Sequence, residues 1–142
     1  QIFRGKYRVA EFDTPTNVPF YYGMDFGFSQ DPNAIIRSFV VGNTLYIDQE
    51  AWGVGVELGD DLENFVDTVP GIRIHPLPAD NARPETISLL KNRGFNIFGQ
   101  EKLPIEEGIE YLRGFTEIVI HPRCVHTKEE FDLYQYKVDR VT

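Results

Sequence analysis

Short apolar runs separated by turns fill the first third of this chain. The runs at 20–28, 34–41 and 44–52 have the lengths and residue types of β-strands. Gly42-Asn43, between the second and third runs, predicts a tight hairpin turn. Three consecutive strands with short turns form an antiparallel meander. Residues 1–19 mix charged and polar residues with proline, and we expect a lead-in or linker segment there.

Helical spacing appears after the meander. Leu58, Leu62, Phe65 and Val66 recur on one side of a helix expected over 57–68. Two strands are expected next, over 72–80 and 95–99, with a helix from Pro84 to Gly94 between them. A helix through Ile105, Ile109 and Leu112 then ends near Gly114, and a strand follows over 117–121. Thr127 and Glu130 open a short helix that runs through Phe131 or Leu133, and a last strand is expected over 134–138.

This order predicts an α/β fold with a mixed sheet of five or six strands, an antiparallel meander plus parallel strands, flanked by helices. The helix after the third strand would cross over, so that the strand over 72–80 lies parallel to the first. Asp25 and Asp80 end these two apolar runs. They would emerge at the carboxyl ends of neighbouring parallel strands, where open α/β sheets place their sites.

Two carboxylates at one point are costly unless a cation meets them, and they suit Mg²⁺ or Mn²⁺. The plainer alternatives are that Asp25 is a strand-end acid bonded to nearby backbone and that Asp80 caps the next helix. Gly23 and Gly27 flank Asp25 and would leave room for close approach of backbone or metal.

Composition narrows the class of protein. The 142 residues suffice for one domain. The chain has 22 acidic and 14 basic residues, and its net charge of −8 argues against a simple basic surface that binds nucleic acid. Part of the acid excess lies within 57–67, where we expect a solvated helix face. Cys124 is the only cysteine, so no intramolecular disulfide can form and a reducing compartment is expected.

No apolar run has membrane-spanning length and no signal peptide opens the chain, which starts at Gln1. We therefore expect an excised or processed piece of a protein that does not span a membrane. His121, Cys124 and His126 lie close in sequence, but their spacing is not that of a zinc finger, and structural roles are expected.

Four segments, in their order and spacing, resemble the ribonuclease H-like nuclease fold, and more narrowly the C-terminal nuclease domain of the large terminase subunit of tailed bacteriophages. The segments are Tyr22–Phe28 followed by Asp31–Ala34, then Ala79–Glu85, then Gly108–Arg113, and finally Ile120–Cys124 leading into Glu129–Phe131. The resemblance covers nearly all of 20–140, and the nuclease domain is expected over 20–142.

The resemblance implies an endonuclease that cleaves concatemeric viral double-stranded DNA during genome packaging. Asp25 and Asp80 match two metal-binding aspartates of the family, which implies one or two Mg²⁺ or Mn²⁺ ions and two-metal phosphodiester hydrolysis. The family's last acidic ligand lies on a helix beyond Thr142, so the C-terminal end of the domain is expected to be missing and the piece to be weak or inactive. Implied partners are DNA, an ATPase domain of the same polypeptide, the small terminase subunit and the portal protein, in the host cytoplasm.

Two basic residues, Arg83 and Lys102, follow the predicted site in sequence and are candidates for phosphate contacts or ordinary surface bases. Two other functions stay open. A non-catalytic docking module of the packaging motor could retain the fold. The run from Asp25 to Ser29 also resembles the phosphate loop of actin-like and sugar-kinase ATPases, although those proteins need two such subdomains.

Overall fold

The computed structural model describes residues 7–27, 31–81, 83–101 and 110–141, with the backbone alone for 134–141. Two compact units can be distinguished. We call residues 20–37 and 49–102 the aspartate unit, because they contain Asp25 and Asp80, and residues 1–19, 38–48 and 103–142 the terminal unit. Each unit has its own hydrophobic core.

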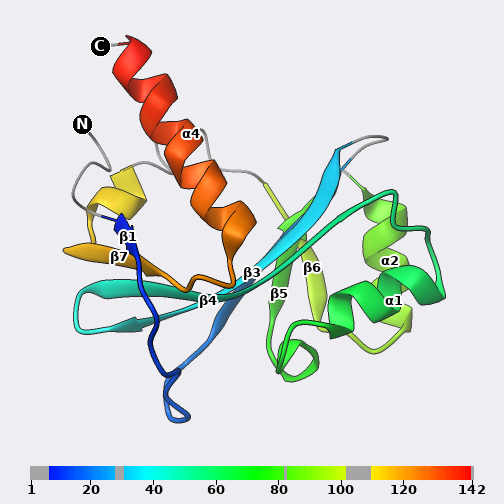
Figure 1. Cartoon of the computed structure of the whole chain (residues 1–142). Coiled ribbons are helices and arrows are strands. Elements are labelled where there is room, and N and C mark those ends of the chain that lie inside the picture. Colours follow the sequence, from blue (N-terminus) through cyan, green and yellow to red (C-terminus); the bar gives the residue numbers. More distant parts are fainter. Residues whose placement is uncertain (1–6, 28–30, 82, 102–109, 142) are drawn as a thin grey trace. The chain divides into compact units, whose positions relative to one another are not determined.

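The described residues form one mixed sheet of seven strands in the order β1-β7-β4-β3-β2-β5-β6 (Figure 1). The pairs β1–β7, β4–β7, β2–β5 and β5–β6 are parallel. A two-residue turn at Gly42, whose φ is 62°, and Asn43 joins β3 to β4, as the hairpin prediction requires. The strands are β1 Tyr7–Val9, β2 Tyr21–Asp25, β3 Pro32–Val41, β4 Thr44–Val54, β5 Leu77–Asp80, β6 Ile97–Gln100 and β7 Glu117–Ile120.

The helices that the structure describes over their full length are α1 Asp60–Asp67, the 3₁₀ helix η1 Ile72–Ile74, α2 Pro84–Asn92 and α4 Val125–Val141. Residues 110–113 are also helical and belong to the helix expected before Gly114. The rest of that expected helix lies outside the described residues. Within the described residues, no helix is long and apolar enough to cross a membrane.

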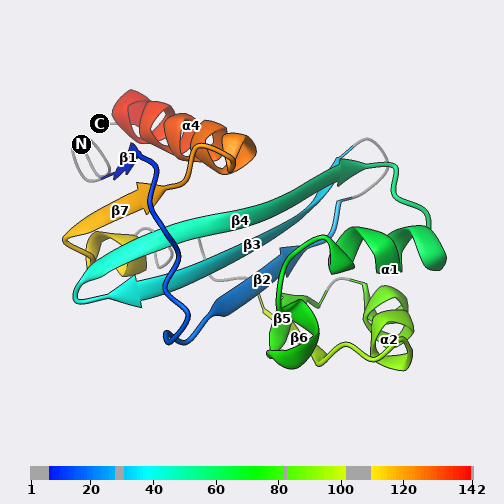
Figure 2. The same ribbon diagram turned by 60° about the horizontal axis from the view of Figure 1, so that its bottom comes forward.

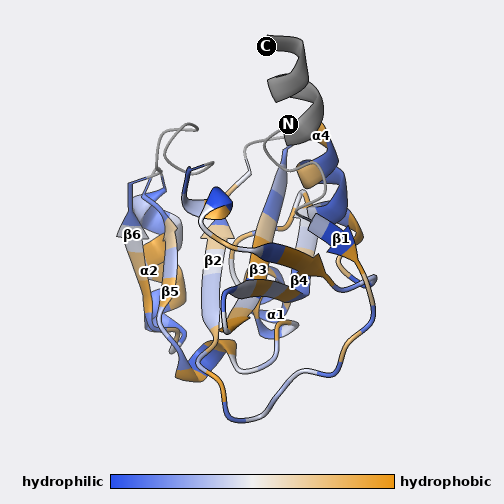
Figure 3. Cartoon of the chain, turned by 90° about the vertical axis from the view of Figure 1, so that its left-hand side faces the viewer, coloured by the Kyte–Doolittle hydropathy of each residue, from blue (hydrophilic) through white to orange (hydrophobic). Residues whose placement is uncertain are grey.

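One face of the sheet in the aspartate unit is buried under α1 and α2. Alternate residues of β2, Tyr22 and Met24, and of β5, Leu77 and Ala79, point to this face and are buried. Figures 1 and 2 show α1 and α2 side by side next to β5 and β6, and orange segments in Figure 3 mark the hydrophobic residues of α2 there. The helices contribute Leu62, Val66, Ile87 and Leu90 to the same core.

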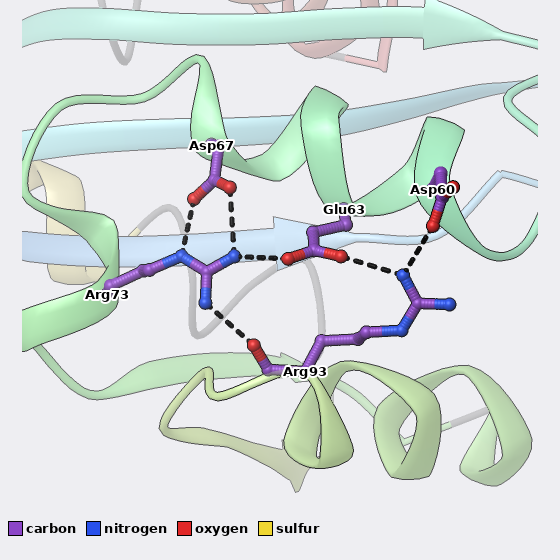
Figure 4. Close-up of polar contacts among 5 residues, drawn as sticks. All are labelled: Asp60, Glu63, Asp67, Arg73 and Arg93. Carbon is purple, nitrogen blue, oxygen red and sulfur yellow. Dashed lines mark hydrogen bonds and ion pairs between the residues drawn. The ribbon is translucent and has the colours of Figure 1, made fainter.

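Five charged side chains join α1, η1 and the end of α2 (Figure 4). Glu63 lies at the centre and accepts hydrogen bonds from Arg73 and Arg93, both at 2.7 Å. Asp67 accepts two bonds from Arg73, and Asp60 accepts one from Arg93. The acidic stretch that the sequence predicted to be a solvated face therefore binds two arginines that lie further along the chain.

This network has a clear effect on ionisation. The bond from Arg93 and then that from Arg73 lower the pKa of Glu63 below its ordinary value. Arg73 also donates to the backbone oxygen of Arg93 at 2.7 Å, and its guanidinium lies 4.1 Å from the ring centre of Phe95. The contacts of Arg73 therefore hold η1 against the end of α2.

The terminal unit is built around β7. Tyr7 and Phe131 pack with their ring centres 5.5 Å apart, and both adjoin a core made by Leu45, Ile47, Ile118, Ile120 and Cys124. The Tyr7 hydroxyl donates to Asp132, which also accepts from Lys128. Burial and the bond to Asp132 raise the pKa of Tyr7 to about 12, so the hydroxyl remains a donor. Phe131 thus packs the first half of α4 against Tyr7 of β1.

Three sequence predictions need correction. Tyr7–Val9 is a strand paired with β7, whereas a lead-in segment was expected there; three residues are too few to show an alternating pattern. Residues 72–74 form η1 and not the start of a strand, because Gly71 adopts a φ of 74° and redirects the chain. Residues 134–138 continue α4, so the predicted strand there is wrong. In α4 the ion pair of Lys128 with Asp132, one helical turn apart, and the packing of Phe131 favour the helix.

We predict that Glu63→Gln lowers the melting temperature at neutral pH more than Asp61→Asn, an equal charge change on the same helix without a part in the network. Because the folded pKa of Glu63 is lowered, its contribution is present above the ordinary value of 4.5 and is lost as the pH falls through the folded pKa. The difference in melting temperature between Glu63→Gln and the wild type should therefore become smaller below about pH 4, as measured by thermal unfolding. A constant difference from pH 7 to 3 would contradict the ionic role.

Candidate metal centre

Asp25 and Asp80 are the last residues of β2 and β5. The two strands are parallel and neighbours, and Met24 is in register with Ala79. The side chains of Met24 and Ala79 are 5% and 3% exposed and point into the core. Because successive side chains of a strand alternate, Asp25 and Asp80 both point away from that core, on strands about 4.8 Å apart. The structure thus brings the two predicted residues side by side on one face.

A pocket of about 390 Å³ opens at these two carboxylates. Ala34 and Ile36 of β3 and Gly23 of β2 provide an apolar lining, and the carboxylates of Asp25, Asp80 and Glu101 provide negative charge. Gln100 and Glu101, at the end of β6, line the same pocket.

The sequence interpretation missed Gln100 and Glu101. Asp80 is in register with Gln100, so the polar side chain of Gln100 is next to Asp80 across the parallel pair. The sequence did contain a signal for these two residues, because the apolar run over 95–99 is followed by polar residues, as the runs before Asp25 and Asp80 are. The strand order β2-β5-β6 that aligns the three strand ends was not available from the sequence.

Gly27, two residues after β2, lies close to Asp31 and Asn33. The Gly27 N–H donates to Asn33 Oδ1 at 2.8 Å, and the Gly27 carbonyl accepts from Arg83 Nη2 at 3.0 Å. A Cβ at Gly27 would lie 2.2 Å from the Asp31 carbonyl oxygen, whereas one at Gly23 would meet nothing within 4 Å. Nearby backbone atoms therefore require a glycine at position 27 but not at position 23.

The donor chemistry fits Mg²⁺ or Mn²⁺. Both ions favour oxygen ligands, and one or two carboxylates with water and substrate phosphate oxygens are the usual set for Mg²⁺. Asp25 and Asp80 supply two such carboxylates at an open pocket. Across the ranges that the structure describes, no group of three histidine, cysteine or acidic side chains is placed to hold a metal. Asp25 and Asp80 therefore remain the predicted pair of metal ligands at this pocket.

The other candidate residues are not at this pocket or not described. Arg83 contacts the Gly27 carbonyl, and its role as a phosphate contact stays a prediction. Lys102, the other candidate, lies outside the described residues. Cys124 is buried, with its Sγ donating to the Ile47 carbonyl at 3.9 Å, and His121 makes contacts with Arg123, so these two residues have structural partners.

The sheet order, the parallel pair of strands and the paired aspartates define a ribonuclease H-like α/β fold. The chain belongs to the family of terminase RNase H-like domains, whose family model matches residues 25–142. It is 29% identical over 129 residues to the PBSX phage terminase large subunit of Bacillus subtilis, with 85% of this chain and 28% of that protein covered. The chain thus spans little more than a quarter of that relative's length.

Two solved structures of terminase nuclease domains are similar. The nuclease domain of the large terminase g2p from bacteriophage SPP1, crystallised with bound Mn, has a TM-score of 0.76 and 25% identity, with 89% of this chain and 77% of that chain covered. The P22 large terminase nuclease domain has a TM-score of 0.71 at 15% identity, covering 94% and 78%, and shows the shared fold.

We predict that Gly27→Ala destabilises the protein by roughly 1–3 kcal/mol, because the added methyl group overlaps a backbone carbonyl that cannot move alone. Gly23→Ala adds the same methyl group within β2, into open space, and serves as the control. Urea unfolding of the two variants measures the difference. Equal stability of Gly27→Ala and Gly23→Ala would show that the turn after β2 is not constrained as described.

Proposed function

We propose that this chain is the metal-dependent endonuclease domain of a phage packaging terminase, which cleaves concatemeric double-stranded DNA. The observation that carries the proposal is the pair Asp25 and Asp80, side by side at the carboxyl ends of adjacent parallel strands and at the mouth of one pocket. The SPP1 domain with bound Mn adds support, because it is 25% identical and has the same fold.

In this mechanism Asp25 and Asp80 would hold one or two divalent ions through their carboxylate oxygens. When bound, the ions supply a water of lowered pKa as the nucleophile and neutralise charge on the scissile phosphate and the departing 3′ oxygen. The two aspartates contribute position and charge, and no covalent intermediate with the protein is needed. The pairing of β2 with β5 fixes the positions of the two strand ends that carry the carboxylates.

Charge suggests how DNA is held. The net charge is −8, and Arg73 and Arg93 in the aspartate unit are bound to Asp60, Glu63 and Asp67. We therefore propose that much of the grip on DNA comes from other parts of the packaging machinery. The ATPase domain of the same polypeptide, the small terminase subunit and the portal protein are the proposed partners, in the host cytoplasm.

Asp25→Asn and Asp80→Asn test the site, with Asp61→Asn on α1 as the control for loss of one negative charge. We expect the melting temperature of the wild-type chain and of Asp61→Asn to rise with Mn²⁺ concentration, because an ion that binds the folded state stabilises it. Both site variants should lose this rise. In the protein at its natural length, each site variant should reduce Mn²⁺- or Mg²⁺-dependent nicking of supercoiled plasmid by about 100-fold or more, since a metal ligand contributes several kcal/mol to the transition state.

Equal nicking or equal Mn²⁺ stabilisation after Asp25→Asn would refute the proposal. The runner-up function, a docking module that keeps the fold without catalysis, predicts no cation-dependent stabilisation of the wild type. The family match over 25–142 speaks for the terminase nuclease and against the actin-like or sugar-kinase ATPase, which tight binding of ATP to the isolated chain would support.

A further inference from the structure

We propose that Arg83 is a positioning residue that ties the loop after Asp25 to the loop after Asp80, and so presets the two carboxylates for a divalent cation. This inference rests on the proposed metal-dependent function and adds a residue to it. Asp25 and Asp80 end neighbouring strands, but each is followed by a separate loop. The hydrogen bond from Arg83 Nη2 to the Gly27 carbonyl at 3.0 Å joins these two loops directly.

The backbone of Arg83 is firmly anchored. Arg83 is the residue before α2, and its carbonyl accepts the backbone N–H groups of Thr86 and Ile87, both at 3.1 Å. Thr86 and Ile87 are buried, so the start of α2 is held in the core of the aspartate unit. The guanidinium therefore reaches the loop after β2 from a rigid base, three residues beyond Asp80.

The acceptor is equally constrained. Gly27 lies two residues beyond Asp25, and its N–H is bound by Asn33 Oδ1 at 2.8 Å while its carbonyl is bound by Arg83. The Asp31 and Pro32 carbonyl oxygens lie 2.2 Å and 2.3 Å from the place a Cβ would occupy, which leaves the turn no freedom on that side. Asn33 and Arg83 thus bind the N–H and the carbonyl of the same residue.

The hydrogen bond between Arg83 and Gly27 is partly buried. Arg83 and Gly27 line a small cavity of about 90 Å³ together with apolar side chains of the loop before α1 and of α1 itself. The remaining lining residues are Phe26, Asn33, Val56, Leu58, Leu62 and Thr86. The guanidinium is charged, so this partly buried bond is a charge-assisted hydrogen bond, which is stronger than one between neutral groups.

The positioning role follows from the charges at the site. Two carboxylates on neighbouring strand ends repel each other until a cation arrives, and this repulsion favours separation of their loops. A link between the loops opposes that separation in the metal-free protein, so less free energy is spent on ordering when the ion binds. Partners that orient metal ligands from outside the ligand shell typically change metal affinity by about 10–100-fold.

Arg83→Gln and Arg83→Lys in the full chain test the proposal, with Lys91→Gln on the exposed side of α2 as the matched loss of one positive charge. Mn²⁺ affinity is measured as the concentration for half-maximal thermal stabilisation, and DNA affinity is measured in Ca²⁺ with a duplex oligonucleotide. We expect Arg83→Gln to weaken Mn²⁺ binding by about 10-fold or more and DNA binding by less than about 3-fold. Arg83→Lys should also weaken Mn²⁺ binding, because lysine lacks the planar fork, and Lys91→Gln should change neither affinity.

Other outcomes overturn the inference. Unchanged Mn²⁺ affinity with weaker DNA binding and a salt dependence reduced by about one charge would make Arg83 a phosphate contact. Unchanged affinity for Mn²⁺ and for DNA would show that Arg83 is an ordinary surface base. If Arg83→Gln does not fold, Arg83→Lys decides on the same two readouts. Absence of any Mn²⁺ stabilisation in the wild type would instead refute the proposed function, and the positioning role with it.

Discussion

The parallel pairing of β2 with β5 is the constraint on which the site depends. Met24 and Ala79 are in register and buried, and this burial decides which face of each strand the next residue takes. A slip of one residue would turn one aspartate towards the core, where an unpaired carboxylate is strongly unfavourable. Burial of one face of the sheet therefore decides which side chains lie on the opposite face, where the candidate site is. The helices α1 and α2 support the site indirectly, because they cover the buried face.

A second theme is how the arginines of the aspartate unit are used. Arg37 donates to the Pro70 carbonyl at 3.2 Å and lies over the ring of Phe20, while Arg73 and Arg93 share Glu63. Arg83 donates to Gly27. Each of the arginines described in this unit thus joins elements of the protein to one another. These four arginines therefore bind within the unit, and the chain as a whole has an excess of acidic residues.

Prediction from the sequence succeeded where local pattern and burial agree. The hairpin at Gly42, the helix opened by Pro84 and the strand that carries Asp80 are all present, because each has both a turn or cap signal and a hydrophobic side. Prediction failed for β1 and for 134–138. β1 is stabilised by pairing with β7 and by Tyr7 packing on Phe131, contacts between residues more than a hundred positions apart. The alternation over 134–138 was too short to outweigh helix propagation from the part of α4 that Phe131 anchors.

The sequence alone determined the class of fold, its resemblance to terminase nucleases, now confirmed by the family match, and the prediction that Asp25 and Asp80 lie near each other. The class of fold and the prediction for the two aspartates follow from periodicity, turn residues and strand-end acids, which are local properties, whereas the resemblance rests on four short segments of the sequence. Only the tertiary structure decided that Gln100 and Glu101 share the pocket, that Glu63 binds two arginines, and that Arg83 reaches Gly27. The order of strands in the sheet and the direction of long side chains depend on packing between distant segments, and no local pattern encodes them.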